Sequence, residues 1–207
     1  MQLYVNATRC VGTMLRRIAR KYLDEVFDPT KTMEEEEILE HFDEHLRFLS
    51  RGTEAIVYAL DDQRVVKVSN PQNLRGEYII FRDPNYQLVT PEVYDHHPDW
   101  LWILVERVEG IDLQNWYRIW EHLPSFTRAI EASTWDKRVA FRSTLVYLQQ
   151  GATPNWWDEL SDYEQTFFRQ VADLHADLGL DPEDMRPANF GVDSDGLLVL
   201  LDIYTGQ

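Results

Sequence analysis

The sequence predicts an α+β protein in which the strands are gathered in one stretch of the chain, between two helical stretches. Three observations support this prediction. Apolar residues recur at helical spacing before residue 50, short β-branched and aromatic runs follow from residue 55 to residue 108, and helical spacing returns from Asp112 onward. A block of strands followed by a block of helices is typical of an α+β fold with two segregated lobes.

The first 49 residues are expected to form a helical hairpin that precedes both lobes. Residues 7–27 carry apolar side chains at helical spacing, with basic residues between them. Thr32 is a candidate N-cap for a second helix over residues 33–49, and the glutamates that follow it suit the positive end of the helix dipole. We therefore predict an N-terminal helical extension over residues 1–49.

Residues 50–110 are expected to form the first lobe, a small antiparallel sheet with one inserted helix. Runs rich in valine, isoleucine and tyrosine mark the strands, and aspartate- and proline-containing turns separate them. We expect strands at residues 55–60, 64–69, 90–96 and 101–108, and a helix at residues 73–81.

Residues 111–207 are expected to form the second lobe, which is helical and ends in a β-hairpin. We predict helices at residues 112–123 and 161–178, with Gly179 closing the second, and hairpin strands at residues 189–192 and 197–204. Four tryptophans are expected to pack in the core instead of forming a recognition surface. They are Trp116, Trp120, Trp156 and Trp157.

The formal net charge of −16 argues against nucleic acid as a partner, because binding to its phosphates draws on clustered lysine and arginine. The same charge is compatible with a nucleotide, since one lysine and a metal ion can neutralise a triphosphate locally. An acidic surface can also imitate DNA, attract a basic protein, or simply keep the protein in solution. The charge alone leaves these alternatives open.

Cys10 is the only cysteine, which excludes an intrachain disulfide and a zinc site built from cysteines. The chain has no apolar stretch of about 18 residues that could span a membrane. Its N-terminus lacks the basic and apolar succession of a secretory signal. We expect a cytoplasmic protein without a membrane partner.

Polar residues gather near the end of the chain, where Asp184, Arg186 and Asn189 lie on one loop and Asp202 lies on the hairpin behind it. Carboxylate and amide oxygens facing one cleft are suitable ligands for Mg²⁺ and neighbours for a phosphate chain. Turns are rich in the same residue types for purely structural reasons. This pattern alone therefore leaves a structural explanation open.

The segment from Asp184 to Asn189, Asp-Met-Arg-Pro-Ala-Asn, resembles the catalytic loop of protein kinases and their relatives, commonly written D-L-K-P-E-N. Asp202 stands where that family has the metal-binding aspartate of its D-F-G motif, at the spacing the family uses. Both strands that flank it are apolar, as the family's hairpin requires.

Three upstream segments resemble the same family in the order that its fold requires. Residues 49–60 resemble the phosphate-covering loop, residues 64–69 resemble the strand that carries a phosphate-binding lysine, and residues 104–110 resemble the hinge between the lobes. The similarity extends over about residues 49–204 and leaves the N-terminal hairpin unexplained.

The resemblance implies that ATP and Mg²⁺ are the cofactors of this protein. Lys67 would contact the α- and β-phosphates under the restraint of Glu77, and the hinge backbone would hold the adenine in front of Val105. The implied nucleotide-binding residues are Gly52, Val57, Lys67, Glu77, Glu106 and Val108.

The resemblance also implies a catalytic set near the C-terminus, to which Lys67 is added from the first lobe. Asp184 would accept or orient the proton of the attacking hydroxyl, and Arg186 would stabilise charge on the transferred phosphoryl group. Asn189 and Asp202 would hold Mg²⁺.

The resemblance thus implies an α+β, two-lobed protein-kinase-like fold with an N-terminal helical hairpin and a truncated C-terminal lobe. Compact phage-encoded protein kinases and aminoglycoside phosphotransferases are the members it resembles most. We expect an ATP-dependent phosphotransferase, specifically a compact Ser/Thr protein kinase that acts on a protein substrate, in the host cytoplasm if it is phage-encoded.

Two departures from the family pattern support a second hypothesis. Ser50 and Ala55 stand where the phosphate-covering loop has glycines, and only three residues follow Tyr204, so that we expect no activation segment. The second hypothesis is a pseudokinase that binds and inhibits a partner protein through its acidic surface. A third, a DNA mimic, rests on the net charge alone.

Overall fold

The computed structural model describes residues 42–51, 55–112, 114–180 and 185–201. The chain divides into two compact units, Met1–Arg47 and Phe48–Gln207. Most of the predicted N-terminal hairpin lies outside the described residues, and the division of the chain at residues 49 and 110 stays a prediction.

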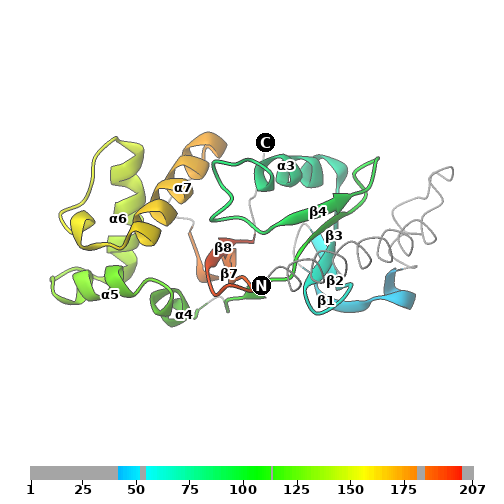
Figure 1. Ribbon diagram of the computed structural model, residues 1–207, viewed down its shortest axis with the longest axis horizontal. Helices are drawn as coiled ribbons and strands as arrows, with labels where there is room; N and C mark the ends of the chain where they lie inside the picture. The colour runs from blue at the N-terminus through cyan, green and yellow to red at the C-terminus, as the bar shows by residue number, and fades with distance from the viewer. Residues whose placement is uncertain (1–41, 52–54, 113, 181–184, 202–207) are drawn as a thin grey trace, which may run out of the picture. The chain divides into compact units, whose positions relative to one another are not determined.

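The first sheet has five strands in the order β1-β2-β3-β5-β4, and the β2–β3, β3–β5 and β5–β4 pairs are antiparallel. Figure 1 shows these strands, and β2, β3, β4 and β5 each fit a short β-branched or aromatic run. Their bounds are β1 Arg47–Arg51, β2 Ala55–Ala59, β3 Arg64–Ser69, β4 Val93–His96 and β5 Ile103–Glu106. The four predicted strands are therefore confirmed, and all of them except β3 are shorter than predicted.

The first strand, β1, corrects the prediction of a helix over residues 33–49. The described helical residues end at His45, and Phe48 and Leu49 belong to β1. The Phe48 ring packs edge-on against Tyr58 of β2, with 6.1 Å between the ring centroids. A helical pattern in the sequence is overridden here because strand pairing and side-chain contact across the sheet stabilise the extended form.

The inserted helix α3 spans Pro71–Phe81 and confirms the helix predicted at residues 73–81. It begins two residues earlier because the Asn70 side chain accepts a hydrogen bond from the Asn73 N–H and Pro71 occupies the first turn. Three of its residues, Leu74, Glu77 and Phe81, are buried. They recur at spacings of three and four, so they lie on one face of the helix.

The second part of the chain is helical, as predicted. Its helices are α4 Trp116–Glu121, α5 Pro124–Glu131, α6 Lys137–Gln149 and α7 Asp162–Leu178, with a 3₁₀ turn at Trp157–Glu159. The helix predicted at residues 112–123 is shorter than expected, because a turn closed by the Asn115 N–H on the Asp112 carbonyl precedes it. Gly179 ends α7 with a φ of +66°, as predicted.

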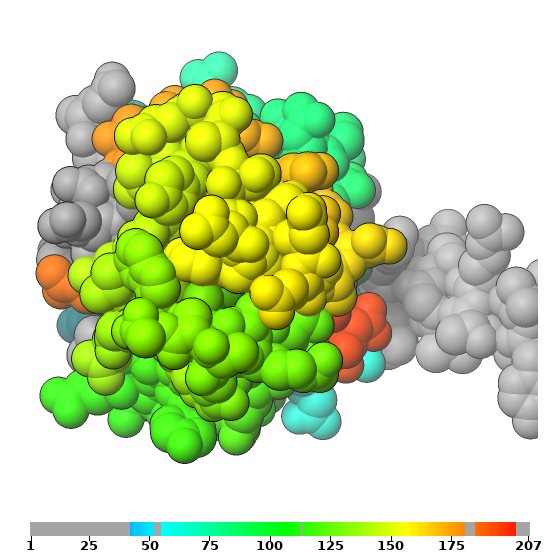
Figure 2. Space-filling model, turned by 90° about the vertical axis from the view of Figure 1, so that its left-hand side faces the viewer, coloured from blue at the N-terminus to red at the C-terminus, as the bar shows by residue number. Residues whose placement is uncertain are grey.

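The core of the helical part is aromatic. Phe141 contacts the rings of Phe126, Phe168 and Phe190, with centroid separations of 6.2, 5.2 and 6.0 Å. Trp116, Trp120, Trp156 and Trp157 are all buried, which confirms that they pack in the core. Figure 2 shows the outer face of this part, where side chains of α5, α6 and the segment after α6 (green to yellow) cover the core.

A second, three-stranded sheet follows the order β6-β7-β8, with β6 at Glu109–Gly110, β7 at Phe190–Val192 and β8 at Leu198–Leu200. The hairpin β7–β8 was predicted, whereas β6 was not. β6 follows β5 after only Arg107 and Val108. Residues 106–109, from the last residue of β5 to the first of β6, therefore join the first sheet to the second and are called the joining segment. In Figure 1 the hairpin lies between the helices and the first sheet.

The predicted α+β class is therefore confirmed. In the part of the chain that the structure describes, no helix is long and apolar enough to cross a membrane.

Gly191 of β7 lies so close to the joining segment that no side chain fits there. A Cβ atom at this position would lie 2.4 Å from Val108 Cγ1 and 3.0 Å from the Glu109 carbonyl oxygen. We expect Gly191→Ala to lower the free energy of unfolding by about 1–3 kcal/mol, because the backbone of the joining segment must move. Chemical denaturation measures this loss.

Gly110→Ala is the matched control for this prediction. Gly110 faces Gly191 across the β6–β7 ladder, but its added Cβ would meet only Leu201 Cδ1, at an ordinary 3.6 Å. An equal loss of stability in both variants would show that the close approach at Gly191 is not the cause.

Candidate functional site

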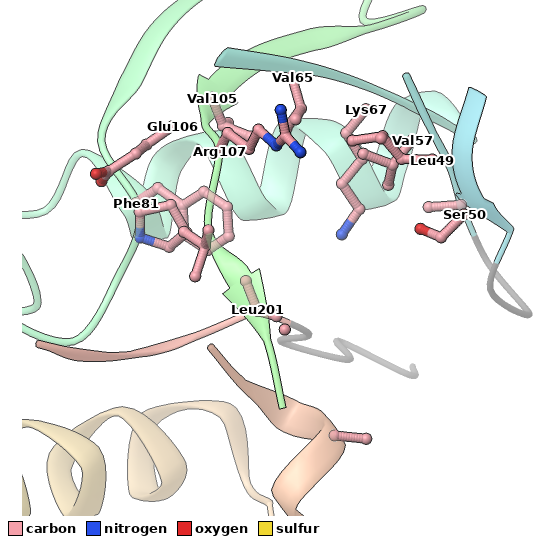
Figure 3. Close-up of a pocket in the computed structure, with 15 residues that line it drawn as sticks. Leu49, Ser50, Val57, Val65, Lys67, Phe81, Val105, Glu106, Arg107 and Leu201 are labelled. Carbon is pink, nitrogen blue, oxygen red and sulfur yellow. The ribbon is translucent and has the colours of Figure 1, made fainter. Parts of the chain in front are cut away.

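A cavity of about 410 Å³ lies where the first sheet faces the second, within the usual size range of small-molecule pockets. Figure 3 shows this cavity. Its walls come from β1, β2, β3, the end of β5, the joining segment and the base of the hairpin. The lining residues include Leu49, Val57, Val65, Lys67, Val105 and Leu201.

The sheet register explains why several of these side chains share one face. Val57 is the cross-strand partner of Lys67, and Val65 is the partner of Val105. Cross-strand partners point to the same side of a sheet, and so do residues two apart in a strand, such as Val65 and Lys67. The four side chains therefore form an apolar surface with a single ammonium group at its inner end.

The ammonium group of Lys67 is held by Glu77 of α3. The Nζ atom donates a hydrogen bond to Glu77 Oε1 at 2.6 Å, and the two side chains are only 12% and 6% exposed. Lys67 also lines the cavity, into which Figure 3 shows its amino group pointing. A buried carboxylate thus orients a cation at the cavity wall, where it can bind an anionic group.

The joining segment supplies the outer wall of the cavity. The Glu106 N–H donates to the Glu92 carbonyl oxygen at 2.8 Å, and the Arg107 N–H donates to the Gln63 carbonyl oxygen at 2.8 Å. Val108 lies beside them, and among the described residues no turn or loop hydrogen bond uses its backbone N–H or C=O. A backbone donor and acceptor that sheet and turn bonds leave over, at the edge of an apolar slot, are suitable for the edge of a planar base.

The predicted loop residues Arg186 and Asn189 lie at the base of the hairpin. Residues Pro187–Asn189 form a 3₁₀ turn, and the Asn189 N–H donates to the Arg186 carbonyl oxygen at 3.0 Å. The Leu201 N–H donates to the Asn189 carbonyl oxygen at 2.8 Å. The structure therefore brings Asn189 beside the residue that directly precedes Asp202 in the chain. Gly52, Asp184 and Asp202 lie outside the described residues.

The segment between α3 and β4 attaches the first lobe to the helical part. The Tyr86 hydroxyl donates to the Asp177 carboxylate of α7, and Gln170 Oε1 of α7 accepts the Leu88 N–H at 3.1 Å. The Leu200 N–H of β8 donates to the Val89 carbonyl oxygen at 2.7 Å. Burial, and then the neighbouring Asp177 carboxylate, raise the pKa of Tyr86, so its hydroxyl stays a donor.

These contacts complete the arrangement that the motifs implied: a strand lysine paired with a helix glutamate, a joining segment, a helical lobe, a loop and a hairpin. The fold is protein-kinase-like.

No protein-family model and no curated protein matches the chain. Three solved structures similar to this kinase-like fold are APH(2")-IIa with gentamicin, APH(2'')-Ib with ADP, and a choline/ethanolamine kinase family protein from Mesorhizobium loti. Their sequence identities are 14%, 15% and 15%, and their TM-scores are 0.38, 0.36 and 0.35. The matches cover 84%, 80% and 76% of this chain, and 70%, 69% and 57% of those chains.

Two residues of the candidate site were missed by sequence reasoning. Phe81 lines the cavity on the side of Glu106, as Figure 3 shows, and its position one turn after Glu77 on the same helix face could have predicted a role in the wall. Arg142 of α6 donates to the Met185 carbonyl oxygen at 3.3 Å and so supports the loop before Arg186. No sequence signal pointed to Arg142, because the contact joins residues far apart in the chain.

Proposed function

We propose that this protein is an ATP- and Mg²⁺-dependent phosphotransferase. One observation carries the proposal: the buried Lys67–Glu77 pair presents an ammonium group to a cavity whose sheet face is apolar. A nucleoside triphosphate combines a planar apolar base with a polyanion. The base would lie between Val57 and Leu201, and the phosphates would face Lys67.

The residues present fit the two cofactors. The adenine edge would bond to the backbone of Glu106 and Val108 in the joining segment, while Gly52 would lie over the phosphates. Asn189 and Asp202 would hold Mg²⁺ through oxygen atoms. Bound Mg²⁺ would neutralise phosphate charge.

The reaction requires little covalent chemistry from the protein. The acceptor hydroxyl oxygen would bond to the γ-phosphorus as the bond to the β–γ bridging oxygen breaks and ADP leaves. Asp184 would accept the hydroxyl proton, and Arg186 would stabilise the transferred phosphoryl group. Arg186 is exposed, so it can reach a bound substrate.

We further propose that the acceptor is a serine or threonine of a basic protein and that the reaction takes place in the cytoplasm. A net charge of −16 attracts basic partners, and a single cysteine suits a reducing compartment. We also propose that the chain consists of three parts, an N-terminal extension over residues 1–49, a first lobe over residues 50–110 and a second lobe over residues 111–207.

A binding protein without catalysis is the second candidate. Ser50 and Ala55 line the cavity at positions where the family's loop has glycines. Side chains at these positions restrict the backbone that would cover the phosphates. In that case the kinase-like fold would serve only to bind a partner protein through its acidic surface.

Thermal unfolding with and without Mg²⁺-ATP tests the proposal. A ligand at about 100 times its dissociation constant stabilises a protein by about 2.7 kcal/mol. We expect Tm to rise by about 5–10 °C, because each kcal/mol shifts Tm by about 2–4 °C in a protein of this size. Asp202→Ala should remove the part of the shift that requires Mg²⁺.

The two candidates give different results in this experiment. No shift at millimolar Mg²⁺-ATP would contradict the phosphotransferase and favour the binding protein. A shift that is the same with and without Mg²⁺ would contradict the assigned metal ligands.

A further inference from the structure

The turn of the hairpin β7–β8 is bonded to the joining segment through a side chain. Ser194 donates twice to Glu106 Oε1, from its hydroxyl at 3.0 Å and from its backbone N–H at 3.3 Å. The other carboxylate oxygen of Glu106 accepts the Glu92 N–H at 3.4 Å. Glu106 thus links the segment proposed to hold the adenine with the hairpin proposed to hold the metal.

The turn that presents Ser194 is rigid. Asp193 Oδ1 accepts the backbone N–H groups of Asp195 at 2.9 Å and of Leu197 at 2.8 Å. Gly196 has a φ of +81°, which closes the turn. Because the turn is already ordered, the bond to Glu106 requires little further loss of conformational entropy.

The hairpin β7–β8 is short and is held by hydrogen bonds at its turn, along β8 and at its base. The position of its turn and the position of its base therefore depend on each other. A ring nitrogen of His122 and the Gly196 carbonyl oxygen lie 2.8 Å apart, and the Leu198 N–H donates to the Tyr163 hydroxyl at 3.1 Å. At the base, the Leu201 N–H donates to the Asn189 carbonyl oxygen. The two strands have only three residues each, so few bonds separate the turn from Asn189.

The carboxylate of Glu106 is held by hydrogen-bond donors alone. Among the ion pairs of the described residues, none includes Glu106. Three carboxylates, those of Glu92, Asp193 and Asp195, line the same hollow beside it, against one cation, Arg82. Repulsion from neighbouring carboxylates favours a Glu106 side chain that points toward solvent, unless a hydrogen-bond donor holds it in place. Ser194 provides both a side-chain and a backbone donor.

We propose that Ser194 is a positioning residue that, through Glu106, sets the distance between the adenine-binding segment and the metal-binding hairpin. This inference rests on the proposed function. A nucleotide that carries Mg²⁺ must contact both elements at once, whereas a nucleotide without the metal depends mainly on the joining segment and Lys67. The bond between Ser194 and Glu106 therefore contributes to the gain in ATP affinity that Mg²⁺ provides.

Isothermal titration of ATP, with and without Mg²⁺, tests this proposal on four variants. Ser194→Ala removes one donor, Ser194→Thr keeps it, and Ser194→Asp places a second carboxylate beside Glu106. Ser133→Ala is the matched control, because Ser133 is also an exposed serine whose hydroxyl forms hydrogen bonds, but with the backbone of Ile130 and Trp135 instead of Glu106.

We expect Ser194→Ala to reduce the gain in affinity from Mg²⁺ by about fivefold, as the loss of a bond to a charged group at an exposed site allows. Ser194→Asp should reduce it more, and Ser194→Thr should retain it. The Tm of the free protein should change by less than about 1–2 °C in all four variants, because exposed turn residues contribute little to stability. A purely structural role would instead lower Tm and leave the effect of Mg²⁺ unchanged.

The outcomes separate this inference from the proposed function. If the unmodified protein binds no nucleotide, both are wrong. If it binds Mg²⁺-ATP and Ser194→Ala keeps the full gain from Mg²⁺, the positioning role is wrong and the phosphotransferase stands. Loss of the gain in Ser133→Ala would also overturn the positioning role.

Discussion

Lys67→Met is expected to abolish phosphoryl transfer and to weaken Mg²⁺-ATP binding by about 10- to 100-fold, the range for a lost hydrogen bond to a charged group. The variant is also expected to be less stable by about 3–5 kcal/mol, because the Glu77 carboxylate, only 6% exposed, would lose the ammonium group that neutralises it. Titration of ATP and urea denaturation measure the two effects separately.

The double variant Lys67→Met, Glu77→Met separates stability from function. Replacing both members of a buried ion pair by apolar side chains of similar volume is often neutral, so most of the stability should return. Nucleotide binding should not return, because the cavity would have lost the ammonium group that the proposal places against the phosphates. If the double variant binds Mg²⁺-ATP as well as the unmodified protein does, Lys67 has no role in the site.

Glu164→Ala is expected to lower the free energy of unfolding by about 3 kcal/mol or more, because it leaves one buried and several partly buried donors without their acceptor. Glu164 is fully buried at the start of α7. Its Oε1 accepts the N–H groups of Ser125 and Phe126 at 2.7 and 3.0 Å, and its Oε2 accepts the N–H and hydroxyl of Ser161. One carboxylate therefore caps both α5 and α7. Differential scanning calorimetry should show Tm lower by about 6–12 °C.

The same residue predicts a dependence of stability on pH. Burial alone would raise the pKa of Glu164, but the hydrogen bonds from Ser161, Phe126 and Ser125 outweigh it, so the pKa lies below its usual value of 4.5. A carboxyl whose pKa is lower in the folded protein stabilises the fold above its usual pKa, and the contribution is lost as pH falls.

Glu164→Gln provides the control for this pH dependence. The glutamine retains the shape of the side chain but has no titrating group. Its free energy of unfolding should therefore fall less steeply than that of the unmodified protein as pH decreases from about 5 to 3, the range below the usual carboxyl pKa. Urea denaturation at several pH values measures both slopes. Equal slopes would show that Glu164 does not contribute to acid sensitivity.

The elements that sequence reasoning predicted correctly are those defined by local signals. Helix α7 begins at Ser161, whose side chain and that of Glu164 form a capping box, and ends at Gly179. Strand β3 was predicted with its bounds unchanged, because a short β-branched run between turns has few alternatives. The same kind of signal was misleading at β1, where a helical pattern continued into residues that pair with a strand.

The contacts of the candidate site were predictable only where a motif spans them. The positions of Lys67 and Glu77 followed from similarity to a known pattern, and the structure places their charged groups 2.6 Å apart. Glu106 and Ser194 are separated by 88 residues, and no pattern joins them. Their bond depends on how β6 positions the hairpin against the joining segment, which is a property of the assembled fold.

The anchoring of α3 has a consequence for control of activity. Tyr86 and Leu88 follow this helix closely and are bonded to Asp177 and Gln170 of α7. A helix tethered in this way cannot swing outward and carry Glu77 away from Lys67 without breaking those bonds. In the proposed phosphotransferase the pair would therefore need no activating event to assemble, and the rate of phosphoryl transfer would depend on the amount of the protein and on the supply of its acceptor.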